Sequence, residues 1–204
     1  MSAIARSPIA PAAPVAVVEG WEVSQRRSAA ALRLSDQSPL AKVLVKADAH
    51  GAFTARHATP FGRADLLAGG VLQVGSDPGS WLLIGPPGSA TAIISEQRSA
   101  VGDVGELVTV IDLTHGRALM RLSGSDSVAL LAKLCAIDLS DAITPNHSAF
   151  RSSVAKLATD VVRHDLADGT RSYLMHCERS SGQHLFDCVL DAGAEFGIDV
   201  DGWS

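Results

Sequence analysis

Residues 110–139, VIDLTHGRALMRLSGSDSVALLAKLCAIDL, form the stretch with the clearest local pattern in this chain. Aliphatic and β-branched residues dominate 107–113 and return at 118–122, on either side of a polar corner at 114–116. Apolar runs of this length, separated by turn residues, are typical of strands. We therefore predict two consecutive strands.

A helix is predicted directly after them, over 125–135. Ser123 and Asp126 stand three residues apart at its start, a spacing that places side-chain acceptors beside the free N–H groups of a first turn. Helical periodicity then gathers its apolar residues on one broad face, which consists of Val128, Leu130, Leu131, Ala132, Leu134 and Cys135. Little of this helix is left for solvent, so we expect it to pack against a sheet.

The same order of elements is predicted on both sides of this stretch. In the first half, strands are expected at 30–34 and 42–47, a hairpin at 71–84, a helix at 89–100 that Gly102 ends, and a strand at 107–113. In the second half, strands are expected at 150–154, 157–163 and 172–177, before a helix that starts near Ser180 and ends at Gly193 or Gly197. Ser180 and Gln183 have capping-box spacing. This order predicts an α+β fold, pseudo-duplicated, with mixed or antiparallel sheets and packed helices.

The chain of 204 residues is long enough for one domain with a sizeable core. Residues 1–18 are rich in Ala and Pro, and we expect them to form a flexible tail. The remainder, 19–204, is predicted to be a single domain made of two similar lobes, about 19–113 and 114–204. Phe61 stands in a Pro- and Gly-containing loop and is expected to be buried.

Composition excludes several classes of function. A net charge of −5 and a pI near 5.7 argue against a nucleic-acid partner, which needs a basic surface. No apolar run is long enough to span a bilayer, and prolines interrupt the N-terminal region where a signal peptide would need a continuous apolar segment. Three cysteines without repeated spacing do not suit a disulfide framework. We expect a cytoplasmic protein without a membrane partner.

Two resemblances appear around the 110–139 stretch. The residues Ile111–His115, Gly124–Asp126, Leu130–Leu134 and Asp138–Leu139 resemble the DxSH…GxDA…ND pattern of the aminomethyltransferase (glycine-cleavage T-protein) superfamily. The fuller wording, together with SVAKLATDVV at 153–162 and CERSSGQHLFD at 177–187, resembles the gamma-subunit family of heterotetrameric sarcosine oxidase. This second likeness extends from about Leu32 to Ile198.

The resemblance implies a folate-binding-type fold and a role as a structural subunit. In that family, the complex oxidises sarcosine to glycine, forms hydrogen peroxide, and passes the one-carbon unit to tetrahydrofolate or releases it as formaldehyde. The resemblance places FAD, FMN, NAD, tetrahydrofolate and zinc in the alpha, beta and delta subunits, and places this chain mainly against alpha. An independent folate-dependent aminomethyl or methyl transferase, or a subunit of a related N-methyl amino acid dehydrogenase, is the alternative.

Asp112, His115 and Asp160 are the candidates for what remains of a folate cleft. The superfamily carries a Gly-Gly-x-x-Asp-Asp segment beside the pterin, and residues 156–161 stand in its place, without the paired glycines and with Val161 for one aspartate. Side chains at glycine positions fill space that a ligand would use. We therefore expect no catalytic or cofactor-binding residue here, and a structural role for Asp160 in a pair with Arg151 or Arg163.

Two further patterns suggest sites but have structural explanations. His184 and Cys188 stand four residues apart on one helical face and could share a metal with His176 and Cys177, but no CxxC pair is present, so no metal site is predicted. The Gly85–Ser89 loop lacks the Lys-Ser/Thr of a phosphate cradle, and its prolines remove N–H groups, so it is expected only to lead into a helix. No GxSxG pattern indicates a nucleophile.

Overall fold

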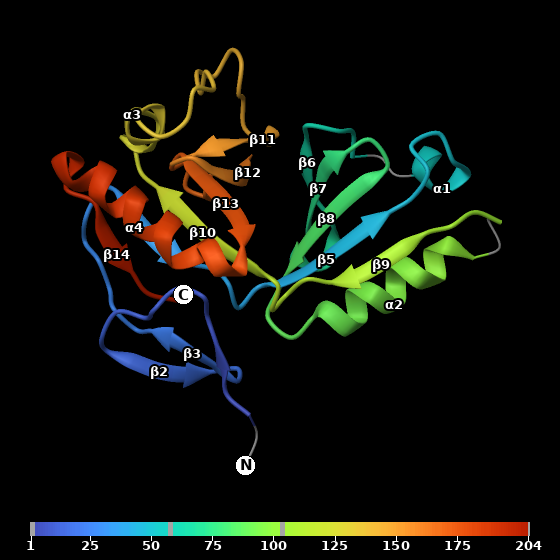
Figure 1. Ribbon diagram of the computed structural model, residues 1–204, viewed down its shortest axis with the longest axis horizontal. Helices are drawn as coiled ribbons and strands as arrows, with labels where there is room; N and C mark the ends of the chain where they lie inside the picture. The colour runs from blue at the N-terminus through green and yellow to red at the C-terminus, as the bar shows by residue number, and fades with distance from the viewer. Residues whose placement is uncertain (1–2, 57–58, 103–104, 204) are drawn as a thin grey trace.

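The structure is a computed structural model that describes residues 3–56, 59–102 and 105–203. Its strands form three sheets, of which the two larger ones lie side by side with their helices on outer faces (Figure 1). This arrangement confirms the predicted α+β class, with helices that cover the outer face of each large sheet.

The first large sheet has five strands in the order β6-β7-β8-β5-β9, all antiparallel to their neighbours. The strands are β5 (Ala41–Lys46), β6 (Ala64–Leu66), β7 (Leu72–Asp77), β8 (Ser80–Gly85) and β9 (Thr109–Asp112). Helix α2 (Ala90–Val101) covers the outer face and ends at Gly102, as predicted. A four-residue helix, α1 (Ala52–Ala55), and a 3-10 turn (Ala68–Gly70) complete this half.

The second large sheet has six strands in the order β11-β12-β13-β10-β4-β14. The strands are β4 (Arg33–Asp36), β10 (Arg117–Ser123), β11 (Ala149–Val154), β12 (Leu157–Arg163), β13 (Ser172–Glu178) and β14 (Asp199–Asp201). Helices α3 (Ser127–Ala132) and α4 (Gly182–Gly193) cover its outer face, and 3-10 turns flank α4 at Arg179–Ser181 and Ala194–Phe196. Strand β4 precedes the five-stranded sheet in sequence but belongs to this one, so sheet membership does not follow a division at 113/114.

Alternation along the strands divides the core into three apolar layers. On β10, Met120 faces α3 and α4, whereas Leu119 faces the other large sheet, because successive side chains point to opposite faces. On β8, Ile84 meets Leu119 in the middle layer, and Leu83 packs toward α2. A binding site between the two sheets would therefore have to be formed by the side chains of the middle layer.

The N-terminal residues differ from the flexible tail that their composition predicts. Strands β1 (Ala5–Arg6), β2 (Val15–Val18) and β3 (Trp21–Ser24) form a small third sheet. Ile9 is 1% exposed and packs into the core beneath α4. The backbone N–H of Ala10 also donates to Oε1 of Gln183 at 2.7 Å. One anchoring isoleucine and a long-range hydrogen bond thus oppose the entropy of a segment that its prolines already restrict.

Three local predictions need correction. Helix α3 is shorter than 125–135, although Cys135 N–H still bonds the Leu131 carbonyl at 2.8 Å. Neither α3 nor α4 has a side-chain cap, and Gln183 serves the N-terminal arm instead of a capping box. Phe61 is 61% exposed, because its loop runs along the sheet surface with the backbone of Phe61 bridged to Gly75.

Candidate functional site

Asp112 and His115 lie together at the end of β9, where both have local structural contacts. Oδ1 of Asp112 accepts a hydrogen bond from the Thr114 N–H at 2.8 Å, which closes the turn. The imidazole of His115 stacks on Trp21, with ring centroids 4.8 Å apart and an interplanar angle of 10°. Both side chains are exposed. They fix the turn and help to attach the small N-terminal sheet.

Asp160 lies on β12, on the face that points toward the five-stranded sheet. Its cross-strand neighbours are Arg151 and His176. Oδ2 lies 3.7 Å from Nη1 of Arg151, as one of the two predicted pairings requires, whereas Arg163 pairs with other carboxylates. Burial raises the pKa of Asp160, although the Arg151 charge acts in the opposite direction. In the described residues, no hydrogen bond or ion pair joins Asp160 to Asp112 or His115.

The space beside Asp160 is too small for a cofactor. The cavity that Asp160, Phe61, Gly75 and Phe150 line has a volume of about 10 Å³. That is the volume of roughly one water-sized sphere. A pterin does not fit beside this carboxylate, so no folate chemistry is derived from it.

Two buried polar residues lie between the sheets: Lys42, which the sequence did not indicate, and His176, which was considered there only as a metal ligand. Lys42 is 0% exposed on β5, and its Nζ donates to the carbonyl oxygens of Ser38 at 2.8 Å and Leu40 at 2.7 Å. Desolvation lowers the pKa of Lys42 to about 8, against the attraction of Asp36 and Asp112. In the sequence, His176 interrupts the otherwise apolar run of β13.

His176 is a neutral imidazole in the middle of the protein. Its Nδ1 lies 3.6 Å from Oδ2 of Asp160, a separation that would suit an ion pair. Burial nevertheless lowers the pKa of His176 to about 3, and the charges of Arg117, Lys42 and Arg151 act in the same direction. Neither ring nitrogen has a hydrogen-bond partner among the described residues. We therefore treat this contact as a close approach between a neutral imidazole and the carboxyl group of Asp160, not as a salt bridge.

The structure separates the residues that might have shared a metal. His176 points between the two sheets, whereas the adjacent Cys177 packs under α4. Nε2 of His184 and Sγ of Cys188 are 3.7 Å apart on the exposed side of α4. Within the described part of the chain, no three or more His, Cys, Asp or Glu side chains are grouped to hold a metal.

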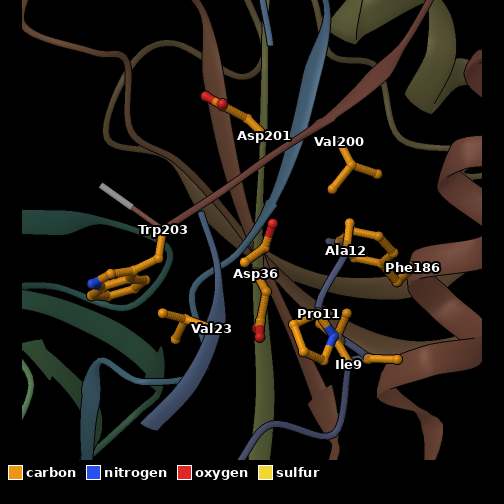
Figure 2. A pocket seen from close by; sticks show the side chains of 11 residues that line it. Ile9, Pro11, Ala12, Val23, Asp36, Phe186, Val200, Asp201 and Trp203 are labelled. Carbon is orange, nitrogen blue, oxygen red and sulfur yellow. The ribbon is translucent and has the colours of Figure 1, made fainter. Parts of the chain in front are cut away.

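A further cavity lies where the N-terminal arm crosses the six-stranded sheet. Figure 2 shows Ile9, Val23 and Phe186 around it, with the carboxylate of Asp36 pointing inward. Burial raises the pKa of Asp36, against hydrogen bonds from Ser38 and Ser7. The cavity again measures about 10 Å³ and suits a water molecule, not a ligand.

The two facing sheets and their outer helices place this protein in a class: it has the T-protein-like aminomethyltransferase fold. The glycine cleavage system aminomethyltransferase T from Bartonella henselae matches with a TM-score of 0.69 at 17% identity, over 92% of this chain and 55% of that one. The present chain therefore corresponds to about half of that enzyme.

The particular family follows from the sequence. A family model for the sarcosine oxidase gamma subunit matches residues 60–195, and the chain belongs to this family. A chain of the heterotetrameric sarcosine oxidase from Corynebacterium sp. U-96, in complex with pyrrole 2-carboxylate, matches with a TM-score of 0.70 at 20% identity, over 86% of this chain and 90% of that one. A search of curated proteins gave no match. No helix in the described residues is long and apolar enough to cross a membrane.

Proposed function

We propose that this chain is a non-catalytic, structural subunit of heterotetrameric sarcosine oxidase. The complex oxidises sarcosine to glycine, with hydrogen peroxide and either 5,10-methylenetetrahydrofolate or formaldehyde as further products. Membership of the gamma-subunit family over 60–195 is the observation that carries this proposal. FAD, FMN, NAD, tetrahydrofolate and zinc are assigned to the alpha, beta and delta subunits, and the complex to the cytoplasm.

The inter-sheet geometry supports a structural role. The lowered pKa of Lys42 would favour a role as a nucleophile, but its ammonium is enclosed and donates to two backbone carbonyls. Asp160 lines a water-sized cavity, and His176 lies buried 3.6 Å from its carboxylate. Catalysis requires a positioned group that reaches the reacting atom, so the enclosure of these side chains supports a structural role.

Exposed apolar side chains offer surface for the contact that we assign mainly to the alpha subunit. Leu107 is 86% exposed, Ile143 65% and Phe61 61%. The buried core of a protein interface is more apolar than the remaining surface, and aromatic side chains are enriched in it. Their exposure here supports a chain that functions in an assembly.

The test combines native mass spectrometry with an absorbance spectrum of the chain purified at low salt from its own source. We expect this chain to copurify with larger chains, and we expect the sample to show the absorbance of a flavin. In the reconstituted complex, the double variant Asp112→Asn/Asp160→Asn should leave kcat for sarcosine unchanged. A colourless, solitary chain whose melting temperature rises with tetrahydrofolate would replace this proposal with the folate-dependent transferase.

A further inference from the structure

A groove of about 340 Å³ opens between the two large sheets, and Asp160, His176 and Lys42 are not part of its lining. Its walls come from β7 and β8 of one sheet and from β10 and β13 of the other, and Trp203 contributes from the C-terminal segment. Most of its lining is apolar, with Leu40, Leu66, Leu72, Ile84 and Leu174 as the principal side chains. This volume accommodates a small organic molecule, unlike the two water-sized cavities.

Arg121 is the charged residue in this lining. It lies in the middle of β10, and its Nη1 donates to Oγ of Ser172 at 2.7 Å and to the His164 carbonyl at 3.1 Å. Both acceptors are neutral. No carboxylate among the described residues forms an ion pair with Arg121.

A comparison with Arg163 makes this lack of a counter-charge informative. Arg121 is half-buried and Arg163 is fully buried, but the guanidinium of Arg163 contacts the carboxylates of Asp165 and Asp141. A buried charge is unfavourable unless an opposite charge or sufficient hydrogen bonds compensate it. Nη1 of Arg121 donates two hydrogen bonds, and the groove opens beside the side chain. An anion bound in the groove would compensate the charge of Arg121, as Asp165 and Asp141 compensate the charge of Arg163.

The other polar groups of the groove limit the charge of such an anion. His164 is half-buried next to Arg121, and desolvation together with the Arg121 charge lowers the pKa of His164. It is therefore neutral at physiological pH and adds no second positive charge. None of the lining residues is acidic. One positive charge in an apolar groove fits one carboxylate, because the planar guanidinium matches carboxylate geometry.

We propose that this groove binds a small organic acid with a single carboxylate on Arg121 and an apolar body against Leu66, Leu72 and Ile84. The inference goes beyond the structural role proposed above and does not depend on it. The ligand would occupy a site in this chain itself, separate from the flavin chemistry assigned to its partners.

The experiment is equilibrium dialysis of the assembled complex against radiolabelled benzoate, with moles bound counted per copy of this chain. Wild type should bind one more benzoate than the Arg121→Gln complex, or bind that molecule at least ten times more tightly. The exposed Arg98→Gln change on α2 is the matched control and should keep wild-type binding. Benzamide, which has the same shape without the charge, should compete at least ten times more weakly.

A second variant covers the case in which Arg121→Gln fails to assemble. Leu66 is 59% exposed at the groove wall, so Leu66→Trp should narrow the groove without disturbing the core, and it should abolish the same binding event. Equal benzoate stoichiometry in wild type and both variants would overturn the proposal. Equal competition by benzamide would also overturn it, as would the finding that a partner's carboxylate already fills the groove and excludes benzoate.

Discussion

The neutral imidazole of His176 makes the stability of this protein depend on pH in a calculable way. Its pKa is about 3 in the folded chain and 6.5 in an unfolded one. Because the folded pKa is the lower of the two, His176 becomes protonated below pH 6.5 in the unfolded state but stays neutral in the folded state. The contribution of neutral His176 is therefore fully present above pH 6.5 and is lost as pH falls from 6.5 toward 3.

The magnitude follows from the width of that window. Each pH unit within it costs about 1.4 kcal/mol of unfolding free energy. Lowering the pH from 7.5 to 5 should therefore reduce the unfolding free energy by about 2 kcal/mol through this one residue. His176→Gln removes the titration but keeps a polar side chain of similar size, so the variant should lack this part of the decrease.

Urea unfolding of both chains, followed by circular dichroism at half-unit steps from pH 5 to 7.5, measures the difference. Subtraction of the variant from wild type cancels the contributions of all other titrating groups. Parallel stability curves for the two chains would refute the assignment of a neutral, buried His176. A wild-type stability that rises toward pH 5 relative to the variant would indicate a true ion pair with Asp160.

Three further predictions concern packing and backbone. Arg163→Met should lower the unfolding free energy by about 3 kcal/mol, since it leaves Asp165 without its buried partner, whereas Arg171→Met on the more exposed side should cost under about 1 kcal/mol; thermal melts compare them. Gly124→Ala should cost roughly 3 kcal/mol or prevent folding, because its Cβ would lie 2.2 Å from the Ala31 carbonyl oxygen at a φ of +135°, whereas Gly169→Ala, with open space around it, should cost about 1 kcal/mol; chemical denaturation ranks the two. Ile9→Ala should cost about 3 kcal/mol and expose the N-terminal arm to limited proteolysis, and Ile4→Ala, 57% exposed, should leave the digestion pattern unchanged.

The sequence allowed prediction of the elements whose apolar periodicity is strong. The β7–β8 hairpin, α2 and strands β10 to β13 all lie where the pattern placed them, because their burial is visible as alternation or helical spacing. The short strands β1, β6 and β14 were missed, since two or three residues carry no period, and their place depends on a sheet built elsewhere in the chain.

Prediction of the site residues from local sequence patterns was limited in the same way. Asp112 and Asp160 were found because they belong to family patterns, and the contact of Asp160 with Arg151 was among the predicted pairs. Lys42 and Arg121 were not singled out, because a charged residue in a strand is normally at the surface. The burial of Lys42 and the half-burial of Arg121 result from the packing of the two sheets, and no local pattern encodes that contact.

The pairing of β4 with β14 has a consequence for how the chain is made. Side chains that hold this corner, Arg26 and Asp199, are 173 residues apart in sequence, and Gly202 N–H bonds the Arg26 carbonyl beside them. Synthesis proceeds at roughly 5–20 residues per second, so on a ribosome the five-stranded sheet can assemble seconds before β14 exists. Until β14 is synthesised, the edge of β4 that will pair with it has no partner strand. A chaperone or a partner subunit that shields β4 during this interval would raise the yield of folded protein without altering its final stability.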